Sequence, residues 1–562
     1  MSVEVSMMFF DAWTQIGARP NKHHAERWSL RHLTDEMQHC SISGALVSHT
    51  QSINYDPMHG NLVLSEELKS KPHLWAIWNV MPHFTGECPP PTRLIEMMRA
   101  HDAKAVSIHP KTNGWDYLAE RNTPLFEKLG SERIPVFLPR EEMGDYRALT
   151  EFLNRNPFLP IVLTGVAWND QRFLLPLLQE HENLHVTFER FQINWGLEDL
   201  VEMGLENQLL FASQAPLRSM GAHRTYIDYA ILPAAVRRKI AGGNLRRLLG
   251  GCGPEFPYGN PEEDTIMRAA RQGEPIPHID LHMHILHEGL NGAGGSYRMH
   301  KGGPRGVFAM LDRLGCLGGG FMSWNGTVSA DTMAGNACTA EALDAAPAGY
   351  WGLASFDPLH YSLEEFRNQI AKLYQCDHRF IGMKPYWIQG LDYTDARYAE
   401  WWKYGNEHHF YALIHRVRAD FAEVDFLAEH YPDVRWVVAH CAADFQTADM
   451  AIACARRHPN VFLEITLTPT YLGVIDYLVE GAGDDRVVYG SDLPMRDPRQ
   501  QFGWVLYSRL SEYQKRRVLL ENARAVIEPC LSRLPEYNRP RAAGDEADVP
   551  RELPEVVAGV LL

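Results

Sequence analysis

The stretch "HIDLHMHILHEG" (278–289) places four histidines within twelve positions. Two prolines just before it disfavour a helix that begins there. Apolar residues from Ile279 to Ile285 alternate with polar ones, which is the period of a β-strand. On a strand His282 and His284 point to the same face, whereas residues two apart on a helix diverge. The stretch therefore predicts a strand that carries a chelating His-x-His pair.

Such a pair is a partial metal site. Neutral imidazole is among the commonest ligands of zinc-like ions. Two ligands rarely hold a catalytic metal, so the pair predicts further ligands downstream. The alternative at this point is a polar strand face that binds no metal.

A long-range repeat relates the two halves of the chain. "IPVFLPREEMGDYRALTEFLNRNPFLPIVLTG" (134–165) resembles "FYALIHRVRADFAEVDFLAEHYPDVRWVVAHC" (410–441), and each reads as strand, helix, turn and strand. "LFASQAP" (210–216) likewise resembles "VYGSDLP" (488–494). The residue offset between matched segments is nearly constant, which indicates two copies of one unit.

Each copy alternates apolar strands with amphipathic helices, an order typical of βα units on a parallel sheet. The length of a copy and its strand count favour an eight-stranded barrel over an open sheet. We therefore predict an α/β fold of two tandem (β/α)8 TIM barrels. The predicted divisions are a first barrel at 1–250, a linker at 251–274, a second barrel at 275–530 and a polar, Pro-rich, loosely ordered tail at 531–562.

The composition is that of a globular protein. The 562 residues are 45% hydrophobic and 22% charged, with a formal net charge of -16, and no dense Lys/Arg run is present. This balance argues against nucleic-acid binding. The nine cysteines lack CxxC spacing, so they indicate neither a disulfide framework nor a thiolate zinc site. With no signal-like or membrane-spanning apolar run, we expect a cytoplasmic protein without a membrane partner.

The two copies differ at the strand ends, where a βα barrel carries its active groups. In the second copy these positions hold His282, His284, Lys384, His415, His440 and Asp492. The matching positions of the first copy hold Trp13, Gln15, Ser107, Pro139, Thr164 and Gln214. Three imidazoles and one carboxylate can hold a divalent ion and leave a position for water. The first barrel is therefore predicted to lack the metal site.

Together, "IDLHMHI", a histidine after the fifth strand, "VVAHC" and "YGSDLP" resemble the amidohydrolase superfamily. The nearest branch is the amidohydrolase-2 group, which includes metal-dependent hydrolases and the aminocarboxymuconate-semialdehyde and resorcylate type decarboxylases. The resemblance implies metal ligands at His282, His284, His415 and Asp492, and a role for His440 in polarising the substrate or orienting water. It also implies one divalent ion, with Zn²⁺ favoured over Mn²⁺ or Fe²⁺.

This ligand set predicts a metal-dependent hydrolase of the amidohydrolase type. A divalent ion lowers the pKa of bound water and polarises a carbonyl group. Asp492 would take the proton from that water and later pass it to the leaving group, while His440 would stabilise oxyanion charge. The substrate would be a small molecule with an amide, lactone or similar C–N or C–O bond.

Two alternatives stay open at the level of sequence. The first is a metal-dependent, non-oxidative decarboxylase, in which the same ion anchors a carboxylated substrate. The second is a non-catalytic binding protein, which the intact ligand set in one copy disfavours.

Three further residues are candidates for contact with the substrate. Lys384 ends the fourth strand; in some branches of the superfamily a lysine there is carboxylated and bridges two metals, but binding of a substrate carboxylate or an ordinary ion pair is favoured. Arg298 lies on a glycine-rich loop and would be an anion clamp or a solvated basic group. Trp387 would line a site for a flat substrate.

The duplication also predicts how the two barrels meet. Single barrels of this family often pair as homodimers, so we expect the two copies to bury a face against each other within the chain. Further homo-oligomerisation is a separate expectation that the sequence leaves open.

Overall fold

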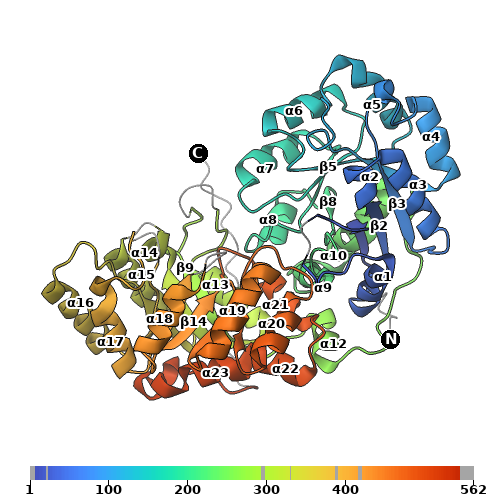
Figure 1. Cartoon of the computed structure of the whole chain (residues 1–562). Coiled ribbons are helices and arrows are strands. Elements are labelled where there is room, and N and C mark those ends of the chain that lie inside the picture. The colour runs from blue at the N-terminus through green and yellow to red at the C-terminus, as the bar shows by residue number, and fades with distance from the viewer. Residues whose placement is uncertain are drawn as a thin grey trace.

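The computed structural model describes residues 7–20, 23–292, 298–328, 331–386, 390–415 and 420–544. Two lobes lie side by side, the first drawn in blue to green and the second in yellow-green to red (Figure 1). Each contains one eight-stranded sheet whose strands follow in chain order, with parallel neighbours throughout. The prediction of two tandem (β/α)8 barrels is confirmed.

Short strands alternate with helices in both lobes. The strands of the first barrel are β1 (Phe10–Ile16), β2 (Gly44–His49), β3 (Leu74–Asn79), β4 (Ala103–Ser107), β5 (Val136–Pro139), β6 (Ile161–Thr164), β7 (Leu184–Thr187) and β8 (Leu209–Leu210). Its main helices are α1 (Leu30–His39), α3 (Pro57–Leu68), α4 (Pro91–Ala100), α5 (Thr123–Ser131), α6 (Tyr146–Arg155), α7 (Gln171–Glu180), α8 (Gly196–Glu202) and α9 (Met220–Asp228).

The second lobe repeats this order. Its strands are β9 (His278–Ile285), β10 (Cys316–Ser323), β11 (Tyr350–Ala354), β12 (Phe380–Met383), β13 (Tyr411–His415), β14 (Arg435–Ala439), β15 (Val461–Glu464) and β16 (Val487–Val488). Its main helices are α13 (Pro304–Leu314), α15 (Thr332–Asp344), α16 (Leu363–Cys376), α17 (Ala399–Glu407), α18 (Ala422–His430), α19 (Phe445–Arg457), α20 (Val474–Ala482) and α21 (Pro498–Leu506).

Backbone hydrogen bonds close each barrel between its first strand and the segment after its last strand. In the first barrel the Gln15 amide donates to the Ala215 carbonyl over 2.8 Å. In the second barrel the His284 amide donates to the Leu493 carbonyl over 2.6 Å. The matching bonds show that Gln15 and His284 occupy the same place, as the sequence repeat predicts.

A buried aspartate fixes the first strand of each barrel in the same way. Asp11 accepts a hydrogen bond from the Trp13 amide over 3.1 Å, and Asp280 accepts one from the His282 amide over 3.0 Å. Trp13 thus stands where the second barrel has His282. Its side chain belongs to the apolar cluster that fills the first barrel and stacks on Phe137 with ring centroids 5.7 Å apart.

One position of the predicted repeat is shifted. The sequence alignment pairs Thr164 with His440, but the structure pairs Gly165 with His440. Both residues follow the sixth strand with a left-handed backbone, at φ 72° and 68°. The Gly165 amide donates to Glu189 over 2.8 Å, and the His440 amide donates to Glu464 over 3.1 Å. The first barrel therefore has no side chain beyond hydrogen at this position.

The barrels contact each other through equivalent helices, α9 and α21, which pack closely. Glycines permit this approach. A Cβ atom added to Gly221 would lie 2.1 Å from Cβ of Tyr507, and one added to Gly503 would lie 2.2 Å from Oγ1 of Thr225. Larger residues at these two positions would force the helices apart.

A buried ion cluster also joins the two barrels. The guanidinium of Arg499, on α21, donates to both carboxylate oxygens of Glu198 over 2.7 and 3.0 Å and to Asp497 over 2.7 and 2.8 Å. Asp497 also accepts from the Trp195 amide of the first barrel over 3.1 Å. All three charged side chains are buried, so each depends on the others for compensation of its charge.

Regular structure occurs in the connecting segment and in the described part of the tail. The stretch 251–274, predicted as a linker, contains helix α12 (Thr265–Gln272), which packs against α9 and α21. Residues 531–544, predicted as part of a loose tail, lie against the second barrel, where the Asn538 amide side chain donates to the Tyr350 carbonyl over 2.8 Å. Residues 545–562 of that predicted tail lie outside the described part of the chain.

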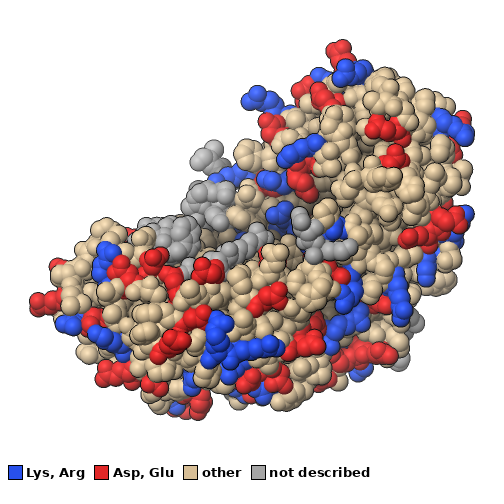
Figure 2. Space-filling model, viewed as in Figure 1, with Lys and Arg blue, Asp and Glu red and all other residues tan. Residues whose placement is uncertain are grey.

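The surface agrees with the acidic composition. Acidic and basic side chains are interspersed over both lobes, without a continuous basic area on the face shown (Figure 2). Among the described residues, none of the helices combines the length and the apolarity that crossing a bilayer requires.

The ion cluster makes a testable prediction about stability. Arg499→Ala leaves two buried carboxylates without their cation, which we expect to lower the free energy of unfolding by about 3–5 kcal/mol. Urea unfolding followed by circular dichroism measures the change. Arg367→Ala, which breaks an exposed pair with Glu400, is the control and should change the midpoint little. Equal midpoints for both variants would contradict the assigned role of the cluster.

Candidate metal centre and active site

The His-x-His pair lies at the carboxyl end of β9, inside the mouth of the second barrel. Both side chains are almost fully buried, with exposed fractions of 1% for His282 and 3% for His284. Asp492, which follows β16, brings Oδ1 to 3.2 Å from Nε2 of His284 and 3.6 Å from Nε2 of His282. One ligand atom from each residue lies within 4.8 Å of the other two. Three of the four predicted metal ligands therefore converge.

The backbone holds Asp492 in this position. Its amide donates to the His282 carbonyl over 2.8 Å, and its φ is 60°, a left-handed conformation that is uncommon for a residue with a side chain. Gln214, its counterpart in the first barrel, has the same hydrogen bond to Trp13 and a φ of 61°. The first barrel thus keeps the backbone of the site and replaces its ligands.

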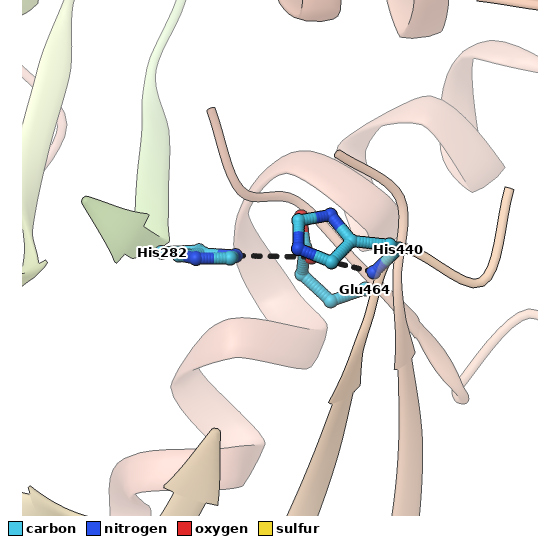
Figure 3. A group of neighbouring side chains, drawn as sticks. All are labelled: His282, His440 and Glu464. Carbon is cyan, nitrogen blue, oxygen red and sulfur yellow. Dashed lines mark hydrogen bonds and ion pairs between the residues drawn. The ribbon is translucent and has the colours of Figure 1, made fainter. Parts of the chain in front are cut away.

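A residue that the sequence prediction missed orients the first histidine. Glu464, at the end of β15, accepts from Nδ1 of His282 over 3.2 Å and from the His440 amide over 3.1 Å (Figure 3). Because Nδ1 faces a carboxylate, Nε2 of His282 carries the lone pair and points toward Asp492. Burial raises the pKa of Glu464 to about 7. In the first barrel Thr187 stands at the place of Glu464, and Glu189, two residues further along, accepts from the Gly165 amide instead.

His440 and His415 form a second imidazole pair beside the first. Nδ1 of His440 lies 2.7 Å from the Thr466 carbonyl, so it donates, and Nε2 of His440 is then an acceptor. Nδ1 of His415 lies 3.2 Å from that Nε2 and donates to it. This assignment leaves the lone pair of His415 on Nε2, where it is able to bind a cation.

Two groups of possible ligand atoms share His282. His282, His284 and Asp492 form one group of converging ligand atoms, and His282, His440 and Glu464 form another. His415 reaches the centre through His440 and belongs to neither group. Its role as a fourth ligand stays a prediction.

The electrostatics of the four histidines suit a divalent cation. Burial lowers the pKa of His282, His284, His415 and His440, the last to about 4. Their rings are therefore neutral near pH 7 and have lone pairs to donate. For Asp492, burial alone would raise the pKa, but the hydrogen bond from His284 and the neighbouring imidazoles lower it below its ordinary range. Neutral nitrogens with one carboxylate fit a zinc-like ion.

Lys384 is a buried cation beside this group. Its Nζ lies 3.5 Å from Nε2 of His282 and 5.9 Å from the centre of the Tyr386 ring. Burial lowers the pKa of Lys384 to about 8, although the charge of Asp492 opposes that shift. Within the described part of the chain, no carboxylate lies within salt-bridge distance of this ammonium group, which leaves it available to an anionic substrate.

Arg298, another predicted contact residue, is bound by the first barrel. The guanidinium of Arg298 pairs with Asp199 and donates to Gln171 over 2.9 Å, and both partners belong to the first barrel. Arg298 is thus neither a solvated group nor a free anion clamp, because the facing barrel supplies its carboxylate. Trp387 lies outside the described residues.

An apolar wall borders the centre on the side of His284. It consists of Leu286, Met299, Trp324 and Met495, all buried. The ring of Trp324 is perpendicular to that of His284, with centroids 4.9 Å apart. Apolar and aromatic surface next to polar ligand groups is typical of small-molecule sites.

Comparison with known proteins identifies the family. The family model described as amidohydrolase matches residues 76–251 and 279–528, so the chain belongs to the amidohydrolase-2 family, and both of its copies contribute to the match. A search of the curated proteins finds no match.

Several solved structures resemble part of this chain. The 5-carboxyvanillate decarboxylase of Sphingomonas paucimobilis is 15% identical, with 44% of this chain and 99% of that chain covered and a TM-score of 0.36. The 2,6-dihydroxybenzoate decarboxylase from Rhizobium is 13% identical (43% and 99% covered, TM-score 0.36). A putative 2-pyrone-4,6-dicarboxylic acid hydrolase from Pseudomonas putida is 16% identical (44% and 98% covered, TM-score 0.34).

Glu464 provides a test of the centre. Glu464→Gln removes the carboxylate that orients His282, and loss of such a partner typically weakens metal affinity by about 10–100-fold. Titration of metal-free protein with Zn²⁺ in a calorimeter measures this. Glu189→Gln changes the buried glutamate of the first barrel that accepts from the Gly165 amide, and it should leave the affinity unchanged. A similar loss in both variants would mean that Glu464 acts on the fold alone.

Proposed function

We propose that the second barrel is a metal-dependent hydrolase that cleaves an amide, lactone or similar C–N or C–O bond of a small molecule. The observation that carries the proposal is the convergence of His282, His284 and Asp492 at the mouth of this barrel. These residues, with His415 as a fourth candidate, would hold the ion. When bound there, a divalent ion supplies polarisation of the scissile carbonyl and acidification of a water molecule.

The residues of the chain divide the remaining work. Asp492 is ionised near neutral pH, because its imidazole neighbours lower its pKa, and is placed to accept the proton of the attacking water. The same carboxyl group then returns that proton to the leaving nitrogen or oxygen. His440, held by Thr466 through Nδ1, accepts from His415 at Nε2 and so positions that ring beside the centre.

A decarboxylase is the second candidate, and Lys384 is the observation that favours it. A buried ammonium without a carboxylate partner within the described residues would bind the carboxylate of a substrate. In this reaction the bond between carbon and the carboxylate breaks, its electron pair stays on carbon, carbon dioxide leaves and a proton is delivered to that carbon. The ligand residues are common to both reactions, so a direct assay must separate them.

The proposed function has a direct test in Asp492→Asn. This substitution removes the proton acceptor, so we expect turnover to fall by about 100-fold or more. Purified protein with a measured metal content is assayed on lactones, amides and aromatic carboxylic acids. Incorporation of heavy oxygen from water indicates hydrolysis, whereas release of carbon dioxide indicates decarboxylation.

The matched control for this experiment is Gln214→Asn, at the equivalent position of the first barrel. It should retain the wild-type rate. Full turnover in Asp492→Asn, with the variant folded, would contradict a catalytic second barrel.

Lys384→Met separates the two candidates. If the ammonium binds a substrate carboxylate, its loss should raise KM for a carboxylated substrate by about 10–100-fold. For a neutral amide or lactone the same variant should leave KM nearly unchanged. Steady-state kinetics measure both values, with Lys403→Met, an exposed lysine of α17, as the control. An unchanged KM for the carboxylated substrate would remove the main support for decarboxylation.

A further inference from the structure

We propose that Trp168 of the first barrel extends the apolar wall of the active site and determines specificity for substrates with a flat aromatic group. The inference rests on the proposed function, because it concerns the same centre in the second barrel. It assigns to the barrel without metal ligands a direct part in substrate selection.

Trp168 reaches the apolar wall across the interface between the barrels. Its indole is half-buried and packs against the cluster of Leu286, Met299, Trp324 and Met495. Trp324, in turn, touches His284 edge to face. The apolar wall therefore connects His284 with Trp168, whose partly buried indole belongs to the first barrel.

A cation fixes the indole in place. The guanidinium of Arg496 lies 4.6 Å from the centre of the Trp168 ring, within the range of a cation–π interaction. Arg496 also donates to Thr468 and to the Met495 carbonyl, and its amide donates to the Asp492 carbonyl over 3.0 Å. Trp168 is thus linked to the chain segment that carries the catalytic carboxylate.

The loop that carries Trp168 is also held by its own barrel. Asp170 accepts from the Ala167 amide over 2.7 Å and from Arg140 through two hydrogen bonds of 2.7 Å. Gln171, the first residue of α7, accepts from Arg298 of the second barrel over 2.9 Å. These bonds fix the loop at both sides of the interface, so the indole is preorganised and does not need to be recruited by the substrate.

This arrangement predicts a preference that simple packing between barrels would not give. A flat aromatic ring gains stacking and apolar contact with an indole, worth about three- to tenfold in affinity, whereas a small aliphatic acid gains neither. Truncation of Trp168 should therefore weaken only ligands with such a ring. A tryptophan that merely fills the interface would affect all ligands equally, through the fold.

The experiment measures binding of benzoate and acetate to the zinc-loaded full chain by calorimetry. Trp168→Leu should weaken benzoate binding about three- to tenfold and leave acetate unchanged, and Trp168→Phe should restore most of the benzoate affinity. Trp115→Leu is the matched control, because Trp115 is also half-buried but stacks on Phe126 within the first barrel. Metal content is determined for each variant.

Several outcomes would overturn the inference. They are undetectable binding of benzoate to the wild type, equal benzoate affinity in wild type and Trp168→Leu, and an equal loss for benzoate and acetate. The proposed function can fail on its own. It fails if the wild type neither retains a divalent ion nor turns over any substrate, even though benzoate binding still depends on Trp168.

Discussion

The site depends on the hydrogen bonds that join the first strand of the second barrel to the segment after its last strand. The Asp492 amide binds the His282 carbonyl, and the His284 amide binds the Leu493 carbonyl. These bonds place residues from opposite ends of the domain in contact, and the parallel order of the strands directs all their carboxyl ends to one mouth. Asp280 supports the closure, because it accepts from the amides of both His282 and Ser491. Without it, the metal ligands would have no common position.

The same closure in the first barrel shows that framework and chemistry are separable. Asp11 accepts from the Trp13 and Ser213 amides as Asp280 does from its partners, and Gln214 repeats the left-handed backbone of Asp492. What differs is the side chains. At Trp13 an indole stacks inside the first barrel and stabilises its core. At the same place in the second barrel, the imidazole of His282 would bind an ion. The first barrel therefore retains the fold of the family without its ligand set.

Sequence reasoning succeeded where a pattern is local and failed where a contact is distant. Alternation around His282 predicted the strand, and repeated apolar segments predicted both barrels. Glu464 was missed because its contact with His282 joins residues 182 positions apart. The one-residue shift at Gly165 could not be predicted, because a run of apolar residues does not show at which residue a strand ends. The partner of Arg298 lies in the other barrel, and no pattern indicates which loops face each other across an interface.

The packing of α9 against α21 also affects how the protein behaves at low concentration. An assembly of separate subunits dissociates on dilution, because its stability depends on protomer concentration. Here both faces belong to one polypeptide, so their encounter is intramolecular and their effective concentration does not change with dilution. The two halves are also synthesised in equal amounts. A barrel that has lost its own ligands is thereby kept permanently beside the one that retains them.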